Sequence, residues 1–350
     1  MNLISFSMVY LVPLSVILGY WLGGIFTFTT PVFVFGVVPL LDAIIGKDTR
    51  NPSEKEAKQL ETALGYRLLT WCCAPLQTAV VFWGANVVSK SSLTFVELTG
   101  FILSIGICSG ILGINVAHEL AHRVNEKMEP VLSKIMLWTT LYMHWGQEHL
   151  VGHHRWVATP EDPATARLGE SFYAFWPRTV GSGFNKAWEF GAKKMKNKNL
   201  PVWSFKNSMA VAIFAQITLV VGVAAFFGVM GVVYIILQSI IAFSLLEVVN
   251  FIEHYGLMRN QNADGTYEPV TPLHSWNSSN WLTNRFLFNL QRHSDHHYKP
   301  GNRYQILRHF DESPQLPTGY AGMILLAVIP PLWRKYMDPK VMKLRRESEK

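Results

Sequence analysis

Histidine is concentrated in four short clusters of this 350-residue chain, which together hold nine of its 12 histidines. The clusters are His118 and His122; His149, His153 and His154; His254; and His293, His296 and His297. Neutral imidazole is a common ligand for iron, zinc and copper. One such ion takes roughly four to six donors, so nine clustered histidines predict two metal ions.

The spacing within the clusters fits metal binding by helices. The first and second clusters each contain a pair at positions i and i+4, which stacks two imidazoles on one face of a helix. His154 directly follows the second pair and points about 100° away round an α-helix, so it can reach a second ion or cap the first. The last cluster has i, i+3, i+4 spacing. The clusters contain no cysteine, which argues against structural zinc.

Polar residues beside the clusters are candidates to support the metals, because a histidine ligand needs an acceptor for its other ring nitrogen. Those that could orient a ring, or ligate directly, are Glu119, Glu148, Asn250, Glu253 and Asp295. The string HELAH also matches the HExxH pattern of zinc proteases. A protease site would leave most of the clustered histidines unexplained. The histidines outside the clusters are expected to be ordinary hydrogen-bonded residues, namely His144, His274 and His309.

The rest of the sequence indicates that a membrane helix bundle positions these clusters. Hydrophobic residues make up 49% of the chain and charged residues only 16%, whereas soluble domains average about 25% charged residues. At roughly 20 residues per span, six transmembrane helices fit. We place them at about residues 4–24, 28–46, 68–88, 95–117, 208–228 and 231–250. No secretory signal is evident, so the first span is expected to be retained.

The distribution of charge places all four clusters on one side of the membrane. Nearly all charged residues fall in segments 47–67, 118–207 and 251–350, which the positive-inside rule assigns to the cytoplasm together with the N-terminus. The predicted fold is an all-α integral membrane protein with a cytoplasmic helical domain. Helices 1–4 lie in 1–117 and helices 5–6 in 208–250, and the other two segments carry the histidines. The net charge of +7 fits loops near anionic membrane lipid, and no nucleic-acid partner is expected.

Four connecting segments have patterns of their own. Residues 47–67 predict a short amphipathic helix, and residues 318–333 predict an interfacial helix ending in two prolines. Residues 129–148 predict one helix, which either packs on the membrane face of the cytoplasmic domain or dips into the bilayer. Residues 259–285 are loop-like. The three cysteines lie inside predicted spans as reduced packing residues, and no CxxC pair offers a rubredoxin-type iron centre.

Four strings of this sequence resemble, in order and spacing, those of the membrane-bound alkane 1-monooxygenases: HELAH, EHLVGHH, NFIEHYGL and LQRHSDHH. Other stretches look similar too, namely Pro39–Asp42, Ala158–Thr165, Trp203–Phe205, His274–Asn277 and Leu316–Tyr320. The resemblance runs from about residue 30 to 340, and it places the chain among the histidine-rich membrane di-iron desaturases and hydroxylases. One departure is Arg123, where many members have lysine.

The resemblance implies a six-helix membrane enzyme whose two iron ions are bound by all nine clustered histidines. It implies O₂-dependent hydroxylation of the terminal methyl group of medium-chain or long-chain n-alkanes to 1-alkanols. Electrons would come from NAD(P)H through rubredoxin reductase and a separate rubredoxin. We expect the enzyme to lie in a bacterial inner membrane, with both termini in the cytoplasm.

An alkane has no group to hydrogen-bond, so selection of its end requires an apolar tunnel that admits a linear molecule end-on. Val34 and Phe35 in the second predicted span are candidate tunnel residues, and the alternative for Val34 is a lipid-facing position. The alternative functions are a xylene-type methyl monooxygenase, a fatty-acyl hydroxylase or desaturase and, outside the enzymes, a membrane metal transporter. Transport sites usually lie near the middle of the membrane, whereas these histidines lie at span ends and in cytoplasmic segments.

Overall fold

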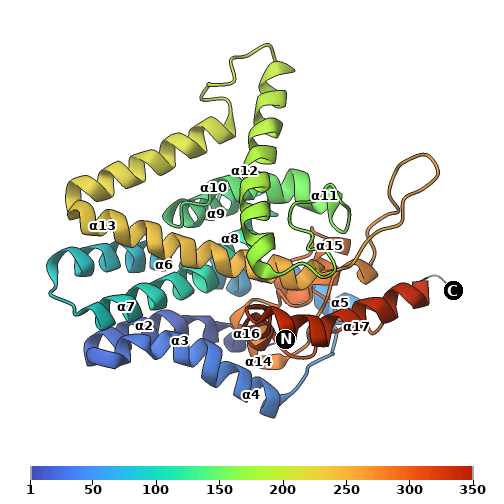
Figure 1. Ribbon diagram of the computed structural model, residues 1–350, viewed down its shortest axis with the longest axis horizontal. Coiled ribbons are helices and arrows are strands. Elements are labelled where there is room, and N and C mark those ends of the chain that lie inside the picture. Colours follow the sequence, from blue (N-terminus) through green and yellow to red (C-terminus); the bar gives the residue numbers. More distant parts are fainter. Residues whose placement is uncertain (1, 349–350) are drawn as a thin grey trace.

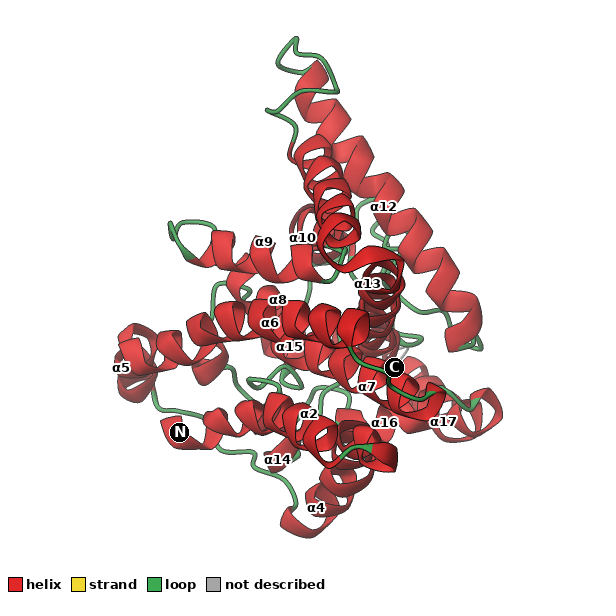
Figure 2. Cartoon of the chain, turned by 90° about the vertical axis from the view of Figure 1, so that its left-hand side faces the viewer, coloured by secondary structure: helices red, strands yellow, loops and turns green. Residues whose placement is uncertain are grey.

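The computed structural model describes residues 2–348, and this part of the chain is helical without any β-strand (Figures 1 and 2). Five helical runs are long and apolar enough to cross a membrane. They are Leu3–Leu22, Gly24–Ile45, Leu64–Lys90, Phe95–Ala121 and Ser208–His254. The protein is therefore an integral membrane protein.

The membrane runs are assembled from several consecutive helices. The first two runs contain α1 (Leu3–Phe6), α2 (Leu11–Leu22), α3 (Thr29–Val32) and α4 (Val38–Ile45). The third run is α6 (Leu64–Lys90), and the fourth continues from α7 (Phe95–Cys108) into α8 (Asn115–Ala121). The fifth run, α13 (Ser208–His254), folds back on itself at Gly228, whose φ of 66° is left-handed and suits glycine (Figure 1). The predicted spans 208–228 and 231–250 are the two arms of α13.

The helices outside these runs lie mostly at one end of the bundle (Figure 1). They are α5 (Glu54–Thr62), α9 (Glu129–Thr139), α10 (Met143–Glu148), α11 (His154–Trp156), α12 (Phe172–Lys196), α14 (Trp281–Phe286), α15 (His293–Tyr298), α16 (Tyr320–Ala327) and α17 (Pro330–Ser348). In Figure 1, α12 runs across the direction of α6, α7 and the second arm of α13.

Local backbone chemistry changes the bounds of three of the four predicted connecting segments. Segment 47–67 contains the predicted short helix as α5, which begins after the capping box of Ser53 and Glu56 and ends before the extended Ala63; α6 then starts at Leu64. Segment 129–148 forms two helices, since Leu141 has a positive φ of 52°. Segment 318–333 is likewise divided into α16 and α17, with α17 starting at the first of the two prolines. Segment 259–285 is loop-like as expected until it enters α14.

Close packing of the membrane helices brings two polar helix ends together. The second arm of α13 packs against α6 and α7, and a Cβ at Gly106 would lie only 2.6 Å from Cβ of Ile241. Small residues allow such close approach in membrane bundles. Helix α8 carries His118 and ends directly before His122, and α13 ends at His254, so both helices bring a histidine cluster to the same end of the bundle.

Candidate metal centre

The nine clustered histidines converge into two adjacent groups at the end of the bundle. The five-histidine group consists of His118, His122, His149, His154 and His296. The four-histidine group consists of His153, His254, His293 and His297. Within each group the candidate ligand atoms all lie within 4.8 Å of one another. His144, His274 and His309 lie outside both groups.

The spacing of the ring nitrogens fits an enclosed metal ion. In the five-histidine group Nε2 of His118 lies 3.0 Å from Nε2 of His296, and Nε2 of His149 lies 3.1 Å from that of His154. In the four-histidine group Nε2 of His293 lies 2.9 Å from that of His297. Two ligands at about 2.1 Å from a metal and at right angles to each other are about 3.0 Å apart. Neutral imidazoles have one N–H each, so hydrogen bonds alone cannot satisfy this many converging nitrogens.

A π-helical segment decides which rings of the second cluster share a group. His149–His153 form π-helix η5, in which residues five apart stack on one face. His149 therefore joins His154 in the five-histidine group, and His153 points into the four-histidine group. The rings of His149 and His153 stack with centroids 5.2 Å apart, as their i and i+4 spacing predicts, but their ligand atoms belong to different groups.

Two carboxylates contact the histidine rings directly. Nδ1 of His153 lies 2.9 Å from Oδ2 of Asp162, which also accepts from Thr165. Oε2 of Glu253 lies 3.2 Å from Nε2 of His293, on the side of the ring where the group's nitrogens converge. The hydroxyl of Tyr320 donates to the other oxygen of Glu253 at 2.7 Å. Asp162 was missed in the sequence because it lies nine residues beyond its histidine, in a loop.

Three of the other four polar candidates pair with groups other than the histidine rings in the described residues 2–348. Glu119 binds Arg123 at 2.7 Å, and Asp295 binds Arg308 at 2.7 Å. Asn250 donates to Glu247 at 3.2 Å. Oε1 of Glu148 is buried without a hydrogen-bond partner in that part of the chain. Glu119, Asp295 and Asn250 therefore pair with other polar groups in this structure, and their role beside the metals stays a prediction.

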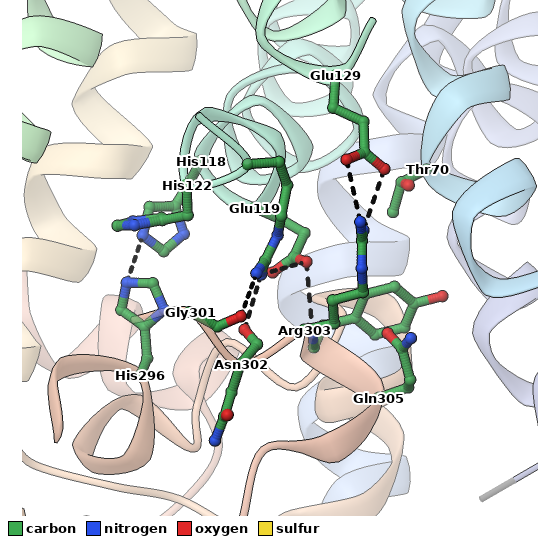
Figure 3. Close-up of polar contacts among 12 residues, drawn as sticks. Thr70, His118, Glu119, His122, Glu129, His296, Gly301, Asn302, Arg303 and Gln305 are labelled. Atoms are coloured by element: carbon green, nitrogen blue, oxygen red, sulfur yellow. Dashed lines mark hydrogen bonds and ion pairs between the residues drawn. The ribbon is translucent and has the colours of Figure 1, made fainter. Parts of the chain in front are cut away.

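The guanidinium of Arg123 joins helix α8 to the loop that follows the last histidine cluster. It donates to Glu119 on α8 and to the carbonyl oxygens of Gly301 and Asn302, at 2.7, 2.5 and 2.7 Å. Figure 3 shows Glu119, Gly301 and Asn302 converging beside His118 and His296. Only 6% of the Arg123 side chain is exposed, so these bonds are shielded from water.

A second buried arginine holds the same loop in place. Arg303 pairs with Glu129 of α9 at 3.0 Å (Figure 3), and Glu129 also accepts from Arg67 and Trp71 of α6. Burial alone would raise the pKa of Glu129, but the hydrogen bonds from Arg303 and Trp71 outweigh it and lower the pKa. The carboxylate therefore stays charged and links α6, α9 and the loop.

Burial also keeps the candidate ligands in the form that binds metals. Desolvation, followed by repulsion between neighbouring rings, holds the pKa values of His122, His149, His154 and His296 well below the usual value. Neutral imidazole is the metal-binding form. His153 differs because Asp162 outweighs its burial and raises its pKa. In the five-histidine group, His122 and His154 are partly exposed, whereas all four members of the other group are buried.

An apolar cavity leads to both histidine groups. It encloses about 890 Å³ of space between atoms, including its opening. His118 and His149 of one group and His293 of the other line one part of it, and Val34 and Phe35 line another. The three π-helical segments, Phe33–Val37, Ser109–Ile114 and His149–His153, all contribute to the lining. Such segments often mark functional sites.

A membrane helix bundle that ends in two groups of buried histidines defines a class of protein, the histidine-ligated membrane metalloproteins. The sequence matches the fatty acid desaturase family model over residues 93–327. It is 43% identical to alkane 1-monooxygenase 2 of Pseudomonas aeruginosa, covering 94% of this chain and 89% of the relative. It is 42% identical to alkane 1-monooxygenase of Acinetobacter baylyi, covering 93% of this chain and 79% of the relative.

A more distant relative is the hydroxylase component of xylene/toluene monooxygenase from Pseudomonas putida, which is 28% identical over 93% of this chain and 85% of its own length. The chain belongs to the fatty acid desaturase family and, within it, to the alkane 1-monooxygenases.

Proposed function

We propose that this protein is a membrane di-iron monooxygenase that uses O₂ to hydroxylate the terminal methyl group of a linear alkane, giving a 1-alkanol. The observation that carries the proposal is the apolar cavity, because histidines from both groups line it. A substrate in this cavity therefore reaches both candidate metal sites. The alkane 1-monooxygenase relatives support the reaction.

The nine histidines are proposed to hold two iron ions, one in each group. Imidazole-rich sites suit iron, and iron bound there would supply the O₂ activation and C–H oxidation that side chains alone cannot. The protein supplies position and dryness. Leu245, Leu246 and Val249 of α13 and Phe286 of α14 line the cavity with apolar surface, which binds a hydrocarbon chain and excludes water.

Polar lining is available near the histidine end of the cavity, where Asn115, Asn250 and Glu253 contribute to its wall. Asn115 precedes His118 by three residues on one helix, and Glu253 contacts His293. We propose that the alkane lies with one methyl group at this polar end and its chain along the apolar part. This orientation would select the terminal carbon.

Electrons are proposed to come from NAD(P)H through rubredoxin reductase and rubredoxin. The sequence has no CxxC pair of its own, and His122 and His154 give the five-histidine group partial exposure. We place six membrane crossings in a bacterial inner membrane, counting the two arms of α13 separately. The histidine segments 118–207 and 251–350 and both termini then lie in the cytoplasm.

The test combines metal analysis with product analysis on the purified, detergent-solubilised protein. Rubredoxin, its reductase and NADH are added with octane, hexadecane or xylene, and products are identified by GC–MS. We expect two irons per chain and 1-alkanol from the alkanes. His293→Ala should lose iron and product, whereas the matched control His144→Phe, outside both groups, should retain both.

Each alternative outcome would favour a different function. Two irons with oxidation of xylene alone would indicate a xylene-type methyl monooxygenase. Two irons without oxidation of any of the three would move the substrate toward fatty-acyl chains. Metal without turnover of any hydrocarbon or acyl lipid would favour a metal transporter.

A further inference from the structure

The connection between α12 and α13, residues 197–207, has a fixed conformation; we call it the elbow. Asn207 caps α13 by accepting from the amide of Met209 at 3.0 Å and donates to the carbonyl of Val202 at 2.9 Å. A Cβ at Gly191 of α12 would lie 2.5 Å from Oδ1 of Asn207, so the last turns of α12 pack directly on the elbow. Both views show the elbow projecting from the bundle (Figures 1 and 2).

This fixed elbow presents large apolar side chains outward. Trp203 is 69% exposed and Phe205 is 88% exposed. The ring of Trp203 contacts that of Trp188 on α12 at a tilt of 51°, with centroids 4.8 Å apart. Exposure of such rings to water is unfavourable by roughly 25 cal/mol per Å². The exposure of these two rings therefore indicates that the elbow lies in an apolar environment.

A groove continues from these aromatic rings along the first turns of α13. Trp203 and Phe205 line it together with Val211, Phe214 and Ile217. These α13 residues belong to the run Ser208–His254, which is apolar enough to cross a membrane. The groove therefore follows the start of a membrane-spanning run, which is the course expected of a lipid acyl chain.

Positive charge is concentrated on the last turns of α12 and on the elbow, which carries part of the groove lining. Five exposed lysines lie on the last turns of α12 and on the elbow: Lys193, Lys194, Lys196, Lys198 and Lys206. None of them has a carboxylate within 4.0 Å in residues 2–348. Glu189 is the one acidic residue of the sequence between 171 and 207. The lysines are thus available to an external anion.

We infer that the elbow binds an anionic phospholipid of the cytoplasmic leaflet, with the lysines on its headgroup and an acyl chain in the groove. Basic and aromatic residues together at a span end are typical of the membrane interface. An acidic protein would explain the lysines, but it would not explain a groove that enters the membrane. The inference depends on the membrane location and is independent of the metal chemistry.

Occupation of this site would stabilise α12 against the histidine-bearing part of the fold. Helix α12 accepts at the carbonyl of Ala187 from Gln147 of α10 at 2.8 Å, and α10 leads directly into His149. Thr179 of α12 donates to Glu247 of α13 at 3.2 Å. We therefore expect bound lipid to raise thermal stability whether or not metal is present.

Native mass spectrometry of the full-length, delipidated protein in detergent tests the site. Phosphatidylglycerol and phosphatidylcholine with identical acyl chains are titrated separately. Attraction is roughly fivefold per lysine near an anionic surface, so two lysines on one headgroup should favour phosphatidylglycerol by more than tenfold. A variant with Lys193, Lys194, Lys196, Lys198 and Lys206 changed to Gln should lose this preference.

The matched control removes five exposed positive charges from the C-terminal helix α17 instead, by changing Arg334, Lys335, Lys340, Lys343 and Arg346 to Gln. It should keep the preference. The double variant Trp203→Ser, Phe205→Ser keeps the lysines and should bind phosphatidylglycerol at least fivefold more weakly. Thermal unfolding checks that each variant is folded.

Three results would overturn the inference. Equal binding of the two lipids by the unaltered protein would show that the site does not distinguish an anionic headgroup from a zwitterionic one. Equal loss in the elbow and α17 variants would show that net charge alone attracts lipid. A raised KM for rubredoxin in the elbow variant, with lipid binding unchanged, would assign the lysines to a protein partner.

Discussion

Replacement of Arg123 by alanine tests whether this side chain holds the five-histidine group together. The variant removes three hydrogen bonds, to Glu119 and to the carbonyls of Gly301 and Asn302. It also leaves the Glu119 carboxylate, with only 8% of its side chain exposed, without the guanidinium that pairs with it. Breaking a buried ion pair by removal of one partner costs about 3–5 kcal/mol.

The hydrogen bonds of Arg123 join two elements that each carry histidines of the five-histidine group. Arg123 follows His118 and His122 on the chain, while Gly301 and Asn302 follow His296 and His297 by a few residues. Loss of the link separates the element that carries His118 from the element that carries His296. We therefore expect Arg123→Ala to lose metal first from the five-histidine group, so that bound iron falls from two toward one per chain.

The assay is iron quantification together with thermal unfolding of the metal-free protein in the same detergent. Arg123→Lys is the matched control, because it keeps the charge but cannot make all three bonds in one plane; an intermediate loss is expected. A double-mutant cycle with Glu119→Gln should show a coupling of about 1.5–3 kcal/mol. An Arg123→Ala protein that unfolds within 1 kcal/mol of the unaltered protein and binds two irons would refute the reasoning.

Three further predictions follow from the site. Val34→Trp should shift GC–MS products toward shorter alkanols, because Val34 lines the cavity; an unchanged product range would place its side chain outside the substrate path. Asp162→Asn should lower metal affinity about 10-fold to 100-fold in a chelator competition, since Asp162 contacts Nδ1 of His153, and unchanged affinity would count against that role. Burial lowers the pKa of His144 to about 4, so between pH 6.5 and 4 the unfolded chain takes up a proton that the folded chain does not. The free energy of unfolding therefore decreases as the pH is lowered from 6.5 to 4. Thermal unfolding of His144→Phe should therefore depend less on pH in this range, and an equal dependence would contradict the buried, neutral state.

Local properties of the chain predicted most of the architecture. Long apolar runs indicated the membrane helices, because each run satisfies its own backbone hydrogen bonds in lipid. The fourth span continues into His118 and the last arm of α13 ends at His254, as the uninterrupted sequence pattern suggested. Short segments were predicted less well, since N-caps such as Ser53 decide where a helix begins and positive φ values such as that of Leu141 interrupt helices within apolar or amphipathic patterns.

The sequence alone was enough to identify the nine clustered histidines and the class of chemistry, because the type and local spacing of donors are written in short strings. The sequence alone could not predict how these histidines divide into groups of five and four. That division depends on the π-helical register of His149–His153 and on helices meeting from distant parts of the chain. Arg123 acquires its contacts in the same way, whereas Asp162 reaches His153 through the local fold of its loop. Arg123 reaches a loop 178 residues away, and such a contact exists only after the membrane helices have packed and excluded water from the site.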